Sequence, residues 1–74
     1  MTNFSVRLKE IRNLRGKTQA ETAEYLGFKS LRGYQMYEEG KNEPNLTRLV
    51  ALADFFDVTT DYLLGRTDGP DGGG

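Results

Sequence analysis

The chain has 74 residues, contains neither cysteine nor histidine, and carries 10 basic against 11 acidic residues, a net charge of −1. This length fits one small domain, and the composition excludes disulfides, cysteine or histidine metal sites, and a histidine general base. No apolar run is long enough to span a membrane, and no motif indicates a metal, a cofactor or a small-molecule ligand, so we expect a cytoplasmic protein without any of these.

The charges are unevenly distributed along the chain. Residues 1–36 hold seven basic and three acidic side chains, a net +4, whereas residues 37–74 hold three basic and eight acidic ones, a net −5. Such an asymmetry indicates a basic working face and an acidic back. Ordinary solvated charge explains it equally well when it is the only clue.

Apolar residues at helical spacing predict a first helix, opened by Asn3 or Ser5 and ended by Gly16. Its apolar positions are Phe4, Leu8, Ile11, and Leu14 or Arg15.

Two short helices hinged at Gly27 are expected next. Thr18 can cap the first of them because its hydroxyl accepts from N–H groups that a helix start leaves unpaired. Glu21 stands three residues later, where a capping box needs a carboxylate. Ser30 is the expected cap of the second. Helices this short are unstable alone and have to pack on the rest of the chain.

A polar loop is expected over residues 38–44, where Gly40 and Pro44 oppose helix continuation. Asn45 then caps a fourth helix, which carries the strongest amphipathic pattern in the chain. Its apolar stripe consists of Leu46, Leu49, Leu52, Ala53 and Phe56.

A last short helix, capped by Thr59 or Thr60, is expected to end at Gly65. Residues 66–74 are rich in glycine, aspartate and proline, and we expect a disordered tail there. No alternating strand pattern occurs in the sequence. The prediction is therefore an all-α fold of five helices in one domain, residues 1–65, followed by the tail.

Four motifs, in this order and spacing, resemble the Cro/XRE-type helix-turn-helix family of phage and bacterial repressors. They are Arg7-Leu8-Lys9-Glu10-Ile11-Arg12, Lys17-Thr18-Gln19 with Ala23 and Leu26-Gly27, Tyr37-Glu38 with Gly40-Lys41 and Glu43-Pro44, and Leu49-Val50-Ala51-Leu52-Ala53 leading to Asp61-Tyr62-Leu63-Leu64-Gly65. The resemblance implies a compact five-helix, lambda-repressor-like DNA-binding domain with its helix-turn-helix at the second and third helices.

Three features depart from the family pattern. Gly27 and Tyr37 are ten residues apart where the family usually has nine, so one extra residue lies around residues 28–30. Gly33 lies in the interior of the third helix, where glycine costs about 1 kcal/mol relative to alanine. Thr22 occupies a position where the family commonly has leucine.

The resemblance implies that the third helix lies in the major groove, where residues near its start reach base edges. Arg32 is the strongest candidate, because a guanidinium can donate two hydrogen bonds to the O6 and N7 atoms of guanine. Leu31 and Met36 are candidates for contact with thymine methyl groups. Gln35 has an amide able to bind adenine or phosphate, and Gly33 could admit DNA close to the backbone. Leu31, Met36 and Gln35 could equally be ordinary surface residues, Gly33 could simply be tolerated, and a solvated surface arginine is the weaker alternative for Arg32.

A second set of polar residues is expected on phosphates, which fix the position of a protein on DNA without reading its sequence. For Gln19 this role comes from the resemblance, and the helix start behind it also favours an anion. The set consists of Lys17, Gln19, Lys29, Ser30, Lys41 and Asn42.

The resemblance also implies two contacts that do not involve DNA. Arg12 and Glu38 are expected to form an internal ion pair that joins the first helix to the end of the third. The family usually binds DNA as a two-fold dimer, and Val50, Phe55 and Tyr62, which lie off the main apolar stripe, are the expected dimer patch. Exposed aromatic residues of this kind are also common without any partner.

The function that follows is sequence-specific binding of double-stranded DNA by a transcriptional regulator, a repressor that binds a palindromic operator as a homodimer. The alternative is an antitoxin-like or other protein-interaction module that uses the same fold without specific DNA binding. The acidic total charge and the irregular turn before the third helix favour it. An enzyme is disfavoured, because the neighbouring carboxylates Glu38 and Glu39 are expected to be solvated in a loop that shows no sign of a cleft.

Overall fold

The computed structural model describes residues 4–67 of the chain, and these residues form five helices without a strand. The helices are α1 (Phe4–Leu14), α2 (Gln19–Tyr25), α3 (Leu31–Glu38), α4 (Leu46–Phe56) and α5 (Thr60–Leu63). The predicted all-α fold of five helices is therefore confirmed. Within the described range no helix has both the length and the apolar character that a membrane crossing requires.

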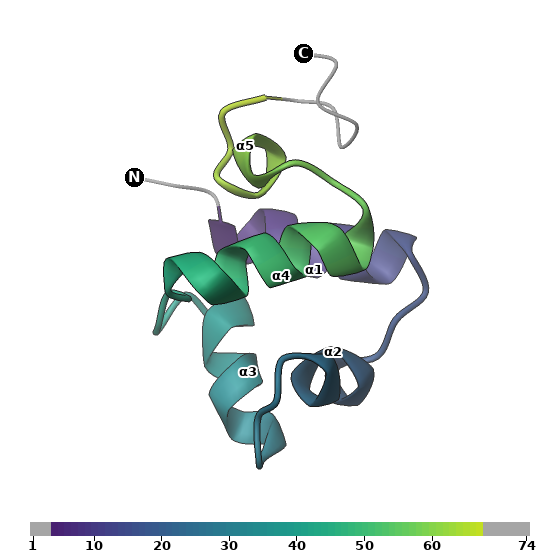
Figure 1. The fold of residues 1–74 in the computed structure, drawn as a ribbon, viewed down its shortest axis with the longest axis vertical. Helices are drawn as coiled ribbons and strands as arrows, with labels where there is room; N and C mark the ends of the chain where they lie inside the picture. The colour runs from purple at the N-terminus through teal and green to yellow at the C-terminus, as the bar shows by residue number, and fades with distance from the viewer. Residues whose placement is uncertain (1–3, 68–74) are drawn as a thin grey trace.

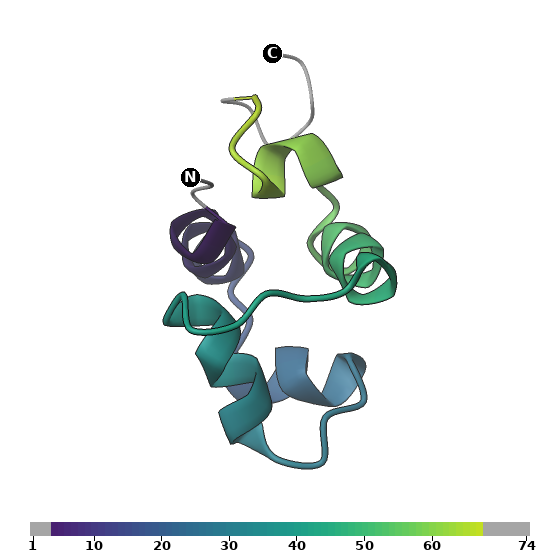
Figure 2. The ribbon, with the colours of Figure 1, turned by 90° about the vertical axis from the view of Figure 1, so that its left-hand side faces the viewer.

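The helices follow one another along the long axis of the molecule, with α1 and α4 lying across it in the middle (Figure 1). When the molecule is turned by 90°, α1 and α4 are seen nearly end-on at its two sides, with α5 at one end and the α2–α3 pair at the other (Figure 2). Contacts of α1 with both α3 and α5 tie the two ends together. The helix pair thus forms one end of the molecule, and α5 forms the opposite end.

All five helices contribute side chains to a single core. It consists of Phe4, Leu8, Ile11, Ala23, Tyr34, Tyr37, Leu49, Leu52, Ala53, Phe56, Tyr62 and Leu63. The stripes predicted for α1 and α4 are wrong at their ends, since Leu14 is exposed and Leu46 is 80% exposed. Each is the terminal residue of its helix and lies outside the core.

The helix starts follow the predicted capping in most places. The side chains of Thr18, Asn45 and Thr59 each accept a hydrogen bond from the backbone N–H three residues later. Ser5 lies inside α1 and is not its cap, whereas Asn3 lies outside the described residues. The predicted loop begins too early, because Glu38 is the last residue of α3.

The first two residues of the predicted tail, Arg66 and Thr67, lie within the described range and form hydrogen bonds with the fold, whereas disorder of the tail stays a prediction. The backbone N–H of Arg66 donates to the carbonyl of Asp61 at 2.8 Å, and the carbonyl of Thr67 accepts from Arg7 Nη1 at 2.9 Å. These bonds hold the chain against the fold as far as Thr67. Residues 68–74 lie outside the described range.

Candidate nucleic-acid interface

The two helices of the pair begin differently. At α2 the Thr18 hydroxyl accepts from the N–H of Glu21 at 3.0 Å, and the Glu21 carboxylate accepts from the N–H of Thr18 at 2.8 Å. At α3 Ser30 occupies the cap position in an extended conformation, but its hydroxyl makes no capping hydrogen bond. The expected cap of α3 is therefore present in position only.

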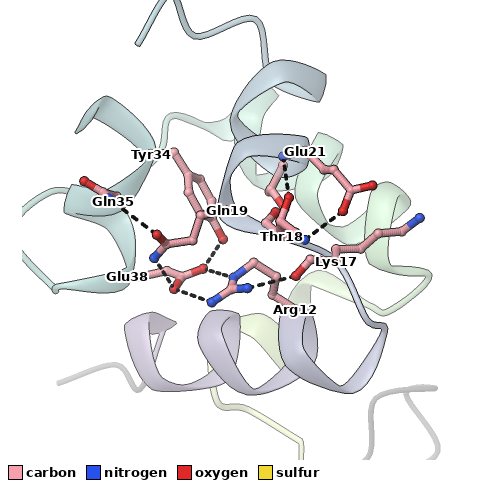
Figure 3. A network of polar contacts seen from close by, with 9 residues as sticks. Arg12, Lys17, Thr18, Gln19, Glu21, Tyr34, Gln35 and Glu38 are labelled. Atoms are coloured by element: carbon pink, nitrogen blue, oxygen red, sulfur yellow. Dashed lines mark hydrogen bonds and ion pairs between the residues drawn. The ribbon is translucent and has the colours of Figure 1, made fainter. Parts of the chain in front are cut away.

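A buried ion pair joins α1 to the end of α3 (Figure 3). Arg12 Nε donates to Glu38 Oε2 at 2.5 Å, and Arg12 Nη2 donates to Glu38 Oε1 at 3.1 Å. The third nitrogen, Nη1, donates to the carbonyl of Lys17 at 2.8 Å, just before α2. One guanidinium thus holds α1, the start of α2 and the end of α3 in fixed relation.

Two further side chains donate to the same carboxylate. The Tyr34 hydroxyl donates to Glu38 Oε2, and Gln19 Nε2 donates to Glu38 Oε1 at 3.1 Å. Burial by itself raises the pKa of Glu38, but the hydrogen bonds from Arg12, Tyr34 and Gln19 outweigh it and hold the pKa below its ordinary value. Burial also raises the pKa of the Tyr34 phenol. The network therefore contains an ionised carboxylate and a neutral phenol at ordinary pH.

The network corrects the expectation that Glu38 is solvated, and it engages Gln19, whose phosphate contact stays a prediction. Glu38 is not solvated, because its side chain is only 3% exposed. Gln19, expected on a phosphate, donates to Glu38 and accepts from Gln35 Nε2 at 3.1 Å, so its amide is engaged within the protein (Figure 3). Gln35, which was expected to contact a base, is half-buried and donates its amide N–H to Gln19.

The outer face of α3 carries part of the expected set of base contacts. Leu31 and Arg32 are exposed at the start of the helix, and Met36 is half-buried. The expectation that Gly33 lies on this outer side is wrong. A Cβ atom added at Gly33 would lie 2.7 Å from two ring carbons of Phe28, so the glycine faces another part of the protein.

Arg32 is engaged by the residue that follows α3. Its Nη1 and Nη2 donate to Glu39 Oε2 and Oε1 at 2.8 and 3.0 Å, and Lys41 Nζ lies 3.4 Å from Glu39 Oε1. Hydrogen bonding from Arg32 holds the pKa of Glu39 below its ordinary value. The same carboxylate thus binds one expected base contact and one expected phosphate contact. A guanine contact through these two nitrogens requires Arg32 to leave Glu39.

The other expected phosphate contacts are spread over three places. Lys29 and Ser30 are exposed in the turn between α2 and α3, and Asn42 is exposed in the loop after α3. Lys17 is half-buried before α2, with its ammonium 5.6 Å from the centre of the Phe55 ring. Only the turn residues adjoin the exposed start of α3.

Phe28 is a structural residue of this region that the sequence analysis missed. The Arg48 guanidinium lies 4.0 Å from the centre of its ring, and the ring of Tyr37 meets it edge-on at 5.6 Å. The available signal was a pair of departures from the family pattern: an extra residue in the turn and, a few positions later, Gly33 inside a helix. Taken together they predict that a bulky turn residue packs where a Cβ atom is missing.

Comparison with known proteins places this arrangement in a family. A helix-turn-helix family model matches residues 8–63. The chain belongs to the Cro/C1-type helix-turn-helix family. The family resemblance read from the motifs is therefore confirmed.

Similar helix-turn-helix proteins occur in phage and bacterial genomes. The SPbeta prophage-derived uncharacterized HTH-type transcriptional regulator YonR of Bacillus subtilis is 42% identical over 64 residues, which cover 86% of this chain and 58% of YonR. The cryptic phage CTXphi transcriptional repressor RstR of Vibrio cholerae is 40% identical over 60 residues, covering 81% of this chain and 53% of RstR. The chain thus spans between half and three-fifths of the length of these two relatives.

A solved structure agrees with the fold of this helix-turn-helix chain. The crystal structure of a transcriptional regulator from Listeria innocua superposes with a TM-score of 0.82 at 25% identity. The match covers 90% of this chain and 62% of the other.

The surface expected to pair two copies of this helix-turn-helix domain is only partly available. Val50 on α4 is 50% exposed. Tyr62 is 7% exposed, with the Arg7 guanidinium 4.7 Å from its ring centre, so its assignment to a surface patch is wrong. Phe55 is half-buried and its ring stacks on that of Tyr25 at 4.4 Å. Of the three residues, Val50 is the most exposed.

Proposed function

We propose that this chain is the DNA-binding part of a sequence-specific transcriptional regulator, a repressor that binds a palindromic operator as a homodimer. The observation that carries the proposal is the placement of α3. This second helix of the pair lies at one end of the molecule and exposes Leu31 and Arg32 at its start. In helix-turn-helix proteins the corresponding helix enters the major groove and contacts base edges with its N-terminal residues.

The buried network supports the proposal through rigidity. Arg12, Glu38, Tyr34 and Gln19 fix α3 against α1 and α2 by hydrogen bonds of defined direction. A recognition helix held in this way loses little freedom on binding, so more of the contact energy remains as affinity. The names of the relatives YonR and RstR, a transcriptional regulator and a transcriptional repressor, favour the same function.

The exposed side chains divide the expected contacts into two kinds. Arg32 is the proposed reader of guanine, with Leu31 beside it on a thymine methyl group. Lys29, Ser30 and Lys41 are the proposed phosphate contacts, which make binding fall steeply as salt rises. Two copies of the domain, one for each half of a palindrome, would supply the two-fold symmetry of the operator, and the exposed part of α4 around Val50 is the proposed contact between them.

The test is selection from a pool of randomised DNA duplexes. The wild type is expected to enrich a palindrome, and Arg32→Ala is expected to lose the preference for one base pair in each half. Arg66→Ala is the matched control, because Arg66 is an exposed arginine that follows α5, the helix at the opposite end of the molecule from the α2–α3 pair. Enrichment of a single half-site would overturn the dimer, and sequence-blind binding unchanged by Arg32→Ala would overturn the specific regulator.

A further inference from the structure

Phe28, in the turn before α3, packs so close to residue 33 of that helix that only glycine fits there. A Cβ atom built on Gly33 would lie 2.7 Å from both Cδ1 and Cε1 of Phe28 and 3.6 Å from its Cγ. Side-chain carbons do not approach one another this closely, so the ring lies directly against the backbone of α3 at this residue. Glycine has a low helix propensity and therefore weakens α3 at this position. Its lack of a side chain allows the ring to pack this closely.

Contacts with three helices hold Phe28 in this position. On α4 the Arg48 guanidinium lies 4.0 Å from the ring centre, and Arg48 Nη1 also donates to the Tyr37 hydroxyl at 3.3 Å. The Tyr37 ring itself meets Phe28 edge-on. The backbone N–H of Phe28 donates to the carbonyl of Ala23 at 3.0 Å, which ties the residue to α2. Phe28 is thus held between α2, α3 and α4.

The position of the candidate base readers depends on this packing. Leu31 and Arg32 directly precede Gly33 in the first turn of α3, and the cap residue Ser30 makes no capping hydrogen bond that would fix this turn. We propose that Phe28 is a positioning residue: its ring, seated on Gly33, sets where the start of α3 lies and hence which base pair Arg32 reaches. The inference rests on the proposed function.

The alternative role for Gly33, a close approach of DNA to the helix backbone, makes a different prediction. In that case a side chain at residue 33 would harm binding whatever residue occupies position 28. The direction of the missing Cβ atom favours the contact within the protein, because it points at the Phe28 ring. The two roles are separable by a pair of substitutions.

The experiment is a double-mutant cycle of Gly33→Ala, Phe28→Ala and the combined variant, with Asn13→Ala on the exposed side of α1 as a control for helix propensity. Each variant is measured at a temperature at which circular dichroism shows it fully folded. The readout is the ratio of the affinity for the operator selected by the wild type to the affinity for a scrambled duplex. A merely structural contact would lower the melting temperature and leave this ratio unchanged for the folded protein.

We expect Gly33→Ala and Phe28→Ala each to lower the ratio about tenfold, the size of one misplaced base contact. The combined variant is expected to lose no more than either single variant, because both changes break the same contact. A wild-type ratio in Phe28→Ala or in Gly33→Ala, or losses that add in the combined variant, would overturn the positioning role. A wild type that prefers no duplex would instead overturn the proposed function itself.

Discussion

Glu38 and Glu39 are neighbours in the chain, and each forms two hydrogen bonds with an arginine, yet their surroundings are opposite. The Glu38 side chain is 3% exposed and joins three helices, whereas the Glu39 side chain is 40% exposed and holds Arg32 on the outer face of α3. The inner pair fixes α3 in place. The outer pair occupies side chains that the proposed function requires for DNA. A hydrogen-bonded pair of arginine and glutamate therefore stabilises the fold at Glu38 and competes with the proposed DNA binding at Glu39.

The largest effect is expected from breaking the inner pair. Arg12→Ala leaves the Glu38 carboxylate buried without its cation and is expected to lower the free energy of unfolding by about 3 kcal/mol, measured by urea denaturation. Arg32→Ala removes the same side chain from the outer pair and is the matched control, for which a midpoint near that of the wild type is expected. Equal losses in the two variants would contradict the comparison.

An intermediate effect is expected from acid. Because the pKa of Glu38 is lower in the folded state than in the unfolded state, its stabilisation is fully present above the unfolded value near 4.5 and is lost as the pH falls through the folded value. The urea concentration at the unfolding midpoint of the wild type is therefore expected to fall between about pH 5 and about pH 3. This range brackets the ordinary pKa of a glutamate. Glu38→Gln should flatten this part of the profile, and an unchanged slope would argue against the inner pair as its source.

The smallest effect is expected at the outer pair and concerns binding instead of stability. Glu39→Gln frees Arg32 and Lys41 and is expected to tighten DNA binding about threefold at fixed salt, the range of an exposed ion pair. Glu43→Gln removes the same charge from an exposed residue of the same loop and controls for charge alone. The gain should shrink in an Arg32→Ala background to the part that Lys41 contributes. Weaker binding by Glu39→Gln would mean that the carboxylate supports Arg32 instead of competing for it.

The two pairs also differ in how far the sequence predicted them. The Arg12–Glu38 pair was expected from the family resemblance alone, because both residues lie in the motifs that carry it. The pairing of Arg32 with Glu39 was missed, since it joins residues seven apart across the end of α3 and depends on side-chain conformations that no periodicity encodes. The helix order and most of the core followed from apolar spacing, which burial enforces directly.

The remaining errors have similar physical causes. In the four residues of α5 the pattern is too short to show which side is buried, and Tyr62 is covered by Arg7 from the other end of the chain. Gly33 was assigned to the outer side from the register set by Tyr37-Glu38, and a glycine has no side chain whose polarity could correct that assignment. It faces the ring of Phe28, which lies in the turn where the chain departs from the family spacing.

The contact between the first and last helices has a consequence for synthesis of the protein. Arg7 donates to the carbonyl of Thr67, 60 residues later, and α1 packs on α5. A chain emerging from the ribosome presents α1 first, whereas α5 and Thr67 are the last described parts to be made. Until they emerge, α1 lacks part of its cover. Completion of this fold therefore waits for the end of translation of the domain, and a product that stops before α5 would leave its N-terminal helix open to proteases and chaperones.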